Sequence, residues 1–267
     1  MTETIKTFKH NGNLGDIIFS LPAIITLGGG KLYIDKYAPG IEARPFTDEM
    51  IDQIIELLKT QSYLKEVTRY NGEHIDYDLN KFRELFSCYD HIVNWHLKAF
   101  GVTFDTSKPW LTNIDGKYVN DIVINNTFRD RDILIDWKVL KGYEKLCVFV
   151  GFENEYKRFE KVIGLKIPWY PTKSILELAA IIKGAKLFIG NQSLAFSLAE
   201  AMKVPRILEV HHHCPSCMPM SANGRIILTR KILRKTFSIT PPPLQRVKEF
   251  VGRKNHQVVG FFKRYCH

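Results

Sequence analysis

A loop rich in glycine and asparagine places one carboxylate, Asp16, at the start of a predicted helix. The stretch is HNGNLGDIIFSLPAI, residues 10–24, and its apolar helical pattern begins where the loop ends. Aspartate is a common N-cap or first-turn residue, but a cap alone needs neither two glycines nor two asparagines before it. Because glycine permits tight turns and close approach of a ligand, we predict that Asp16 is a general base toward a substrate hydroxyl. The loop residues expected near this base are Asn11, Gly12, Asn13 and Gly15.

The spacing of the glycines disfavours two common phosphate-binding motifs. NGNLGD does not follow the G-x-G-x-x-G pattern of dinucleotide-binding folds, and the GGGK of residues 28–31 is followed by Leu32 rather than Ser or Thr. We therefore do not expect a plain dinucleotide-binding site or a P-loop in this chain.

A second loop suited to an anion lies in FIGNQSLAFSLAEAM, residues 188–202. A strand pattern passes there through a short polar turn into a helix. Free backbone N–H groups at the helix start, together with the hydroxyl of Ser193, form a natural phosphate site. An ordinary capped helix has the same pattern, so both interpretations stay open. The anion-binding residues predicted in this turn are Gly190, Asn191, Gln192 and Ser193.

The stretch NNTFRDRD, residues 125–132, adds a further anion-binding loop after another predicted strand. Arginine offers fork-shaped donors for phosphate oxygens, although Asp130 and Asp132 could instead pair with the arginines in a solvated loop. Two such loops on one sheet edge favour a diphosphate ligand. The residues predicted to bind it here are Asn126, Thr127, Arg129 and Arg131, and Glu153 or Glu155 after the next strand could hold ribose hydroxyls.

The positive charge of the chain is concentrated at its C-terminal end. The net charge is +10, and residues 225–267 carry 11 basic residues against one acidic residue, Glu249, so the rest of the chain is neutral. This layout suits an anionic partner such as nucleic acid, anionic lipid or an acidic glycan, and a solvated terminal helix is the alternative. We favour nucleic acid over a membrane surface, because the excess of positive charge is concentrated in one segment and no long amphipathic anchor is visible. The residues predicted to bind the acceptor or a polyanion are Arg230, Lys231, Arg234, Lys235, Arg253 and Lys254.

Composition places the chain among ordinary globular proteins. It has 267 residues, 45% of them hydrophobic and 25% charged, with no apolar run of membrane-spanning length and no signal-peptide core. We therefore expect a cytoplasmic protein, and no pattern indicates an obligate protein partner. Its five cysteines are expected to be reduced.

The segment HHHCPSC, residues 211–217, combines three histidines with a C-x-x-C spacing that would suit zinc. No second Cys/His pair at finger spacing follows, so we predict no metal site. We expect instead a loop at a strand's carboxyl end whose residues His211 and His212 lie near the active site.

Strand and helix patterns alternate along the chain and predict an α/β fold. Apolar strands joined by helices indicate parallel sheets covered on both faces. Two successive β/α series suggest two Rossmann-like domains, comprising residues 1–118 and 119–235, and residues 236–267 form a basic tail expected to pack back on the N-terminal domain. The predicted strands are 5–10, 31–35, 64–70, 74–79, 121–126, 145–151, 186–190 and 205–210, and the predicted helices are 15–24, 47–61, 86–101, 132–140, 153–164, 172–185 and 191–202.

Two stretches together resemble glycosyltransferase family 9, the heptosyltransferase-like enzymes. GNLGDIIFSLPAI is similar to the N-terminal signature of that family, and FIGNQSLAFSLAEAMKVPRI is similar to its second signature. The resemblance implies a GT-B fold, in which two Rossmann-like domains with parallel sheets face a central cleft. It departs at Asn191, Gln192 and Ser193, where the family usually has Asp-Thr-Gly, and at Phe196, where a histidine usually follows.

The resemblance also implies an activity. The second domain would hold a nucleotide-diphosphate sugar as donor substrate, with no further cofactor, and the first would hold the acceptor. Transfer would invert the anomeric carbon without a metal ion, with Asp16 as base and residues 191–193 as diphosphate cradle. We favour modified DNA over a lipopolysaccharide-type glycan as the anionic acceptor. The alternative is a catalytically silent nucleotide- or nucleic-acid-binding module on the same scaffold, which Phe196 supports.

Overall fold

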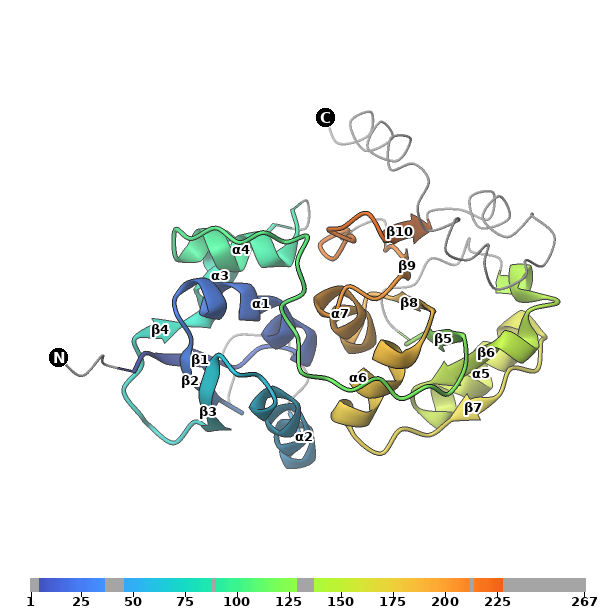
Figure 1. Cartoon of the computed structure of the whole chain (residues 1–267), viewed down its shortest axis with the longest axis horizontal. Coiled ribbons are helices and arrows are strands. Elements are labelled where there is room, and N and C mark those ends of the chain that lie inside the picture. The colour runs from blue at the N-terminus through green and yellow to red at the C-terminus, as the bar shows by residue number, and fades with distance from the viewer. Residues whose placement is uncertain (1–4, 37–45, 88–89, 129–136, 212–213, 228–267) are drawn as a thin grey trace.

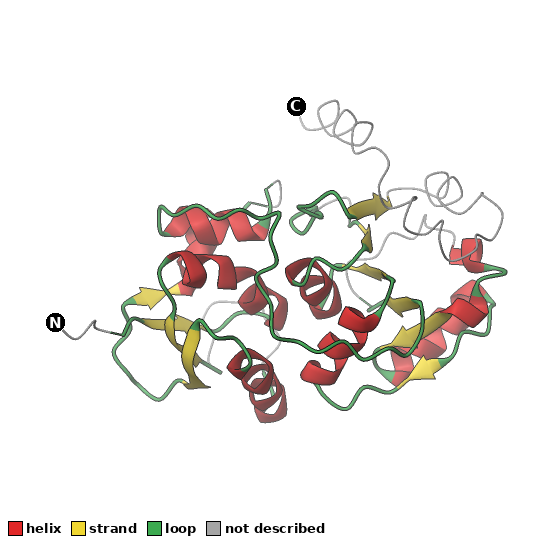
Figure 2. Cartoon of the chain, viewed as in Figure 1, coloured by secondary structure: helices red, strands yellow, loops and turns green. Residues whose placement is uncertain are grey.

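The computed structural model describes residues 5–36, 46–87, 90–128, 137–211 and 214–227. They form two parallel β-sheets, one at either end of the molecule in Figure 1, with helices between them; Figure 2 shows the same layers by element type. We call the elements around the sheet of β1 to β4 the first lobe and those around the sheet of β5 to β10 the second lobe. The predicted α/β class with two parallel sheets is confirmed.

The first sheet has the strand order β3-β2-β1-β4, and every neighbouring pair is parallel. Its centre is buried at Phe8 and His10 of β1 and at most positions of β2, whereas the edge strand β3 is exposed at several positions. Its strands are β1 (Thr7–His10), β2 (Gly30–Ile34), β3 (Leu64–Arg69) and β4 (Tyr77–Asp78).

The second sheet has the order β10-β9-β8-β5-β6-β7, again parallel throughout. Counted from β5, this is the 3-2-1-4-5-6 order of doubly wound nucleotide-binding sheets. The strands are β5 (Ile122–Asn125), β6 (Cys147–Val150), β7 (Trp169–Tyr170), β8 (Leu187–Asn191), β9 (Arg206–Glu209) and β10 (Gly224–Ile227).

The helices begin where the sequence provides capping side chains. Thr47, Ser174 and Ser193 each accept a hydrogen bond from the backbone N–H three residues later, which stabilises a helix start. The helix after β6 ends at Gly164, whose φ of 66° suits glycine. The α-helices are α1 (Leu14–Thr26), α2 (Asp48–Lys59), α3 (Phe82–Leu85), α4 (Ile92–Ala99), α5 (Glu153–Ile163), α6 (Ile175–Gly184) and α7 (Leu194–Ala201), and 3₁₀ turns cover Leu79–Lys81, Trp137–Leu140 and Glu144–Leu146.

Several predicted elements are shorter or different in the structure. The helix expected over 86–101 starts only at Ile92, because His91 caps it by accepting a hydrogen bond from the N–H of Val93 at Nδ1. The described part of the helix expected over 132–140 is a 3₁₀ turn, and the strand expected over 74–79 is reduced to two residues. The sequence analysis did not predict β7 and β10.

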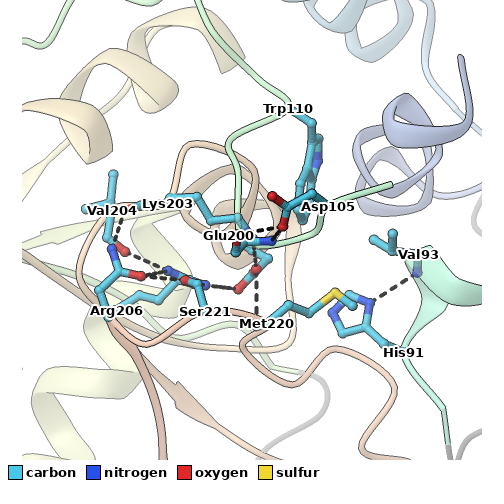
Figure 3. A network of polar contacts seen from close by, with 12 residues as sticks. His91, Val93, Asp105, Trp110, Glu200, Lys203, Val204, Arg206, Met220 and Ser221 are labelled. Atoms are coloured by element: carbon cyan, nitrogen blue, oxygen red, sulfur yellow. Dashed lines mark hydrogen bonds and ion pairs between the residues drawn. The ribbon is translucent and has the colours of Figure 1, made fainter. Parts of the chain in front are cut away.

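Helices of the two lobes pack directly against each other. In Figure 1, α1 and α2 of the first lobe face α7 and α6 of the second, and these pairs are in contact. One hydrophobic core cluster extends from Phe8 in β1 to Phe188 in β8. Polar groups also lie at this boundary (Figure 3), where His91 of the first lobe interacts electrostatically with the buried Glu200 of α7. The two lobes therefore share one hydrophobic core cluster, and a second cluster lies within the second lobe.

Two sequence predictions are not tested by this arrangement. The basic tail, 236–267, lies outside the described residues, and the division into domains at residue 118 stays a prediction. Within the described ranges, no helix combines the length and the apolar character that crossing a membrane requires.

Candidate functional site

Both loops singled out from the sequence lie at switch points of their sheets. Ligands of open parallel sheets bind at the carboxyl ends of the strands, where the strand order reverses. In the first sheet that point lies between β1 and β4, and the loop bearing Asp16 follows β1. In the second sheet it lies between β5 and β8, whose ends and following loops are residues 125–127 and 191–193. The fold therefore places both loops where chemistry is expected.

Asp16 lies in the first turn of α1, with 16% of its side chain exposed. Its Oδ2 accepts hydrogen bonds from Arg83 Nη2 at 3.2 Å and from Asn13 Nδ2 at 3.4 Å. The contact with Asn13, the N-cap residue, ties the carboxylate to the start of its own helix. The contact with Arg83 comes from a different part of the chain, so Asp16 does more than cap α1.

The surroundings of Asp16 change its acidity in opposite directions. Burial raises the pKa of its carboxyl group above the ordinary value, while the positive charge and hydrogen bond of Arg83 and the contacts with Asn13 lower it; the net effect is a raised pKa. A carboxylate with a raised pKa is better matched to accepting a proton near neutral pH. The electrostatics are consistent with the predicted role as a base.

Of the two glycines of the loop, Gly12 provides room for other side chains. A Cβ atom on Gly12 would lie 2.2 Å from Arg83 Nη2 and 2.6 Å from His10 Cε1, so glycine is needed for Arg83 to reach Asp16. A Cβ on Gly15 would lie 3.5 Å from Ser197 Oγ in α7, an ordinary contact. Gly12 therefore serves the approach of a side chain, whereas the sequence suggested the approach of a ligand.

A histidine pair lies behind this loop. His10 Nδ1 accepts a hydrogen bond from the N–H of Gly12 at 2.9 Å, and the ring of His10 lies 5.5 Å from that of His96. Burial lowers the pKa of His10 well below its ordinary value and lowers that of His96 to about 3, with Arg83 contributing in the same direction. Both rings are therefore neutral at physiological pH.

A segment of the second lobe reaches Asp16. Cys217 interacts electrostatically with Asp16 and also contacts the side chain of Gln192, and burial raises the pKa of its thiol to about 12. Gln192 fastens this segment, because its Nε2 donates to the carbonyl oxygen of Cys214 and its Oε1 accepts from the N–H of His211, both at 2.9 Å. Cys217 therefore belongs to the surroundings of both Asp16 and the predicted diphosphate turn.

The switch-point loops of the second sheet are joined by side-chain hydrogen bonds. Asn191 Oδ1 accepts from the N–H of Thr127 at 2.9 Å, and Asn191 Nδ2 donates to Thr127 Oγ1 at 3.0 Å. Ser193 Oγ donates to Asn125 Oδ1 at 3.0 Å and also caps α7. Asn126 Nδ2 donates to Glu209 Oε2 at 2.7 Å. The structure therefore brings the two predicted anion loops together, with Gly190 in β8 paired beside Asn125.

The two glutamates considered for ribose binding have different surroundings. Glu155 is buried and accepts a hydrogen bond from the N–H of Phe152 at 3.2 Å, which stabilises the start of α5. Glu153 is exposed and pairs with Lys157 at 2.7 Å. Their predicted contact with a ribose remains a prediction.

Two arginines of the site were missed by sequence reasoning. Arg83 reaches Asp16, as described above. Arg158 of α5 donates from Nη2 to the carbonyl oxygen of Asn126 at 2.6 Å and to its Oδ1 at 2.8 Å, and its guanidinium lies 4.6 Å from the centre of the Phe128 ring. The available signal was weak: Arg158 follows Glu155 at helical i,i+3 spacing, and Arg83 follows the strand that ends the first sheet.

Other predicted site residues lie outside the described part of the chain. Among residues that are described, no three His, Cys, Asp or Glu side chains come together as metal ligands. The predicted residues that are not described are Arg129, Arg131, His212, Arg230, Lys231, Arg234, Lys235, Arg253 and Lys254. Their roles, and metal binding by the 211–217 loop, are not decided by this geometry.

The chain is a two-lobed α/β protein of the GT-B class. It has two parallel sheets, each with a candidate loop at its switch point, and helices packed between the sheets. The sequence matches no protein-family model and no curated protein. Solved structures do match. A glycosyltransferase family 9 protein from Veillonella parvula superposes with a TM-score of 0.57 at 13% identity, over 97% of this chain and 95% of that chain.

Escherichia coli heptosyltransferase WaaC is similarly close. Its structure with ADP has a TM-score of 0.56 at 12% identity, covering 92% of this chain and 98% of that chain. Its structure with ADP-2-deoxy-2-fluoro heptose has a TM-score of 0.58 at 12% identity, covering 87% of this chain and 98% of that chain. At these identities the likeness establishes the fold, and the GT-B-like architecture implied by the sequence resemblance is confirmed.

Proposed function

We propose that this chain is a glycosyltransferase that moves a sugar from a nucleotide-diphosphate sugar to a hydroxyl of an anionic acceptor. The observation that carries the proposal is the position of Asp16. Its carboxyl group lies at the switch point of the first sheet, in helix α1, where a Cβ on Gly15 would lie 3.5 Å from Ser197 Oγ in α7, the helix that begins at the predicted diphosphate turn. This packing supports a proton acceptor from one lobe and a leaving-group site from the other at the same boundary.

The reaction follows from this placement. Asp16 accepts the proton of the acceptor hydroxyl as its oxygen forms a bond to the anomeric carbon. The bond from that carbon to the diphosphate breaks on the opposite side, so the configuration inverts. Backbone N–H groups at the start of α7 and the cation Arg158 stabilise the charge that develops on the departing diphosphate. No metal ion is required in this proposal, as the sequence resemblance implies.

The donor to test first carries ADP. Two matching structures of WaaC contain ADP or an ADP-linked fluoro-heptose. A thermal-shift panel of nucleotide sugars, with ADP-heptose and ADP included, tests this, because a ligand that binds only the native state raises the melting temperature. A shift with an ADP-linked sugar supports the proposal, and a shift with another base only would assign a different donor.

The acceptor we favour is modified DNA, ahead of a lipopolysaccharide-type glycan. The support is the concentration of positive charge in residues 225–267, which suits neutralisation of phosphates. A base in duplex DNA would have to be extruded to reach Asp16. Binding of duplex DNA at low salt that weakens steeply with added salt is the expected result; no binding at low salt would exclude this acceptor.

The competing hypothesis is a catalytically silent binding module. Phe196, where the family usually has a histidine, is fully buried in the core between the lobes and offers no chemistry. Slow hydrolysis of the donor, with water as acceptor, separates the two. The enzyme should hydrolyse the donor and Asp16→Asn should reduce the rate by about 10²- to 10⁴-fold while donor binding persists. No donor hydrolysis in either protein would support the silent module.

A further inference from the structure

Arg83 has an unusual environment for an arginine. Its guanidinium stacks over the Phe82 ring at 4.6 Å, and only 26% of its side chain is exposed. Among the described residues, Arg83 forms an ion pair with Asp16 through Nη2. The Nε of Arg83 is buried without a hydrogen-bond partner. The side chain is therefore enclosed and directed at one carboxylate.

The surroundings of Asp16 leave Arg83 as the charged group that acts on it within the described residues. Cys217, which faces Asp16 from the second lobe, is a neutral thiol. His10 of β1 and His96 of α4, which face Arg83, are held neutral by burial. Asn13 contributes hydrogen bonds but no charge. Arg83 is thus the one charged group among these that favours the ionised form of Asp16 against burial, and it orients the carboxylate together with Asn13.

The loop sequence leaves space for this pair. A Cβ at residue 12 would overlap Arg83 Nη2 at 2.2 Å, so glycine at this position and arginine at position 83 belong to the same arrangement. A purely structural ion pair on a surface needs no such clearance.

We propose that Arg83 is a positioning residue for Asp16, which orients the carboxylate and keeps it ionised so that it can accept the acceptor proton. The inference rests on the proposed function only in naming Asp16 as the base. The pair itself can be measured without any substrate.

The test is the titration of the Asp16 carboxyl carbon by ¹³C NMR in the whole protein, assigned with Asp16→Asn. Because a cation within a few ångströms favours the ionised form, Arg83→Met should raise the apparent pKa of Asp16 by about one unit or more. Arg83→Lys should give a smaller shift in the pKa of Asp16.

Gly12→Ala displaces Arg83 without removing it and should shift the pKa of Asp16 in the same direction. This variant replaces Arg83→Met in the test if Arg83→Met fails to fold. Arg69→Met, which breaks the exposed pairs of Arg69 with Asp48 and Asp52, is the matched control and should leave Asp16 unchanged.

The same variants are then compared in donor hydrolysis. In Arg83→Met the acid limb of the pH–rate profile should move to higher pH with the Asp16 titration, while KM for the donor stays the same. Identical Asp16 titrations in wild type and in both the Arg83→Met and Gly12→Ala variants would overturn the inference, whatever the activity. If the titration shifts as expected but the wild type never cleaves a donor, the proposed function fails and the role of Arg83 in holding Asp16 ionised stands.

Discussion

The indole N–H of Trp110 donates a hydrogen bond of 3.0 Å to the carbonyl oxygen of Ile18, inside helix α1. Four residues after Ile18 stands Pro22, which has no N–H and so cannot make the helical hydrogen bond to that oxygen. Trp110 lies in the segment that leads to the second lobe, and its indole supplies the missing donor. Its backbone N–H donates to the carbonyl oxygen of Ala201 in α7 at 2.9 Å. One buried residue thus supplies the missing hydrogen bond in α1 with its side chain and joins α1 to α7 with its backbone.

Trp110→Phe should destabilise the protein by about 1–3 kcal/mol, because it leaves the buried oxygen of Ile18 without a donor. Urea unfolding measures the loss. Pro22→Ala restores a backbone N–H for the same oxygen, so the substitution should cost less in the Pro22→Ala background than in the wild type. Equal costs in both backgrounds would mean that Trp110 acts only by packing.

Glu200 and Arg206 form an ion pair with no exposed surface, extended by Lys203 and by the N–H of Met220 (Figure 3). Burial lowers the pKa of Lys203 to about 8, although the charge of Glu200 acts against that shift. Removing one partner of a buried pair leaves an uncompensated charge, so Glu200→Gln should lower the free energy of unfolding by about 3–5 kcal/mol.

The exposed pair of Glu66 with Lys31 provides the control for this prediction. Glu66→Gln should change the free energy of unfolding by less than about 1 kcal/mol, because exposed ion pairs contribute little. Similar losses in both variants, measured by urea unfolding at neutral pH, would contradict the importance assigned to the buried network.

The central strands of the second sheet could be predicted from the sequence because they are short apolar runs between polar turns. The positions of most helices followed from apolar periodicity and from caps such as Thr47 and Ser174. The errors have local causes. His91 caps α4 with a ring nitrogen, a cap that the expected Ser, Thr, Asp or Asn pattern does not include. The strand β7 has two residues, too few for any periodicity.

The candidate site was only half visible in the sequence. Asp16 and Ser193 could be found because each belongs to a local loop-to-helix pattern. Arg83 could not, because it meets Asp16 across 67 residues of chain and its own surroundings in sequence resemble a surface helix. The same holds for Arg158, which contacts Asn126 from α5 across 32 residues. Contacts of this kind arise from strand order, which the sequence pattern does not contain.

Stability should fall as the pH is lowered through the histidine range. Burial lowers the pKa of His91 to about 4 and that of His96 to about 3, and lowers that of His10 as well. Above pH 6.5 both folded and unfolded states are neutral at these positions. Below it only the unfolded state takes up the protons, so the free energy of unfolding falls by about 1.4 kcal/mol per pH unit for each histidine.

Urea unfolding between pH 7 and pH 5 measures this loss, which should reach about 2 kcal/mol per buried histidine. His96→Phe removes one titrating ring that already packs against Phe82 at 4.0 Å, so the variant should lose about 2 kcal/mol less than the wild type over that range. A stability that does not vary from pH 7 to pH 5 would contradict the neutral state of the buried rings.

The fully buried Asn191 should be required for donor binding, because it holds the two switch-point loops of the second sheet in register. Asn191→Ala leaves the N–H of Thr127 without the amide oxygen that it uses, which should destabilise the fold by about 1–3 kcal/mol. It should also weaken ADP at least about tenfold, the loss expected from roughly 1.4 kcal/mol of binding energy. Isothermal titration with ADP measures the second effect, with Asn94→Ala in α4 as the control. Unchanged ADP affinity in a folded Asn191→Ala protein would move the donor site away from these loops.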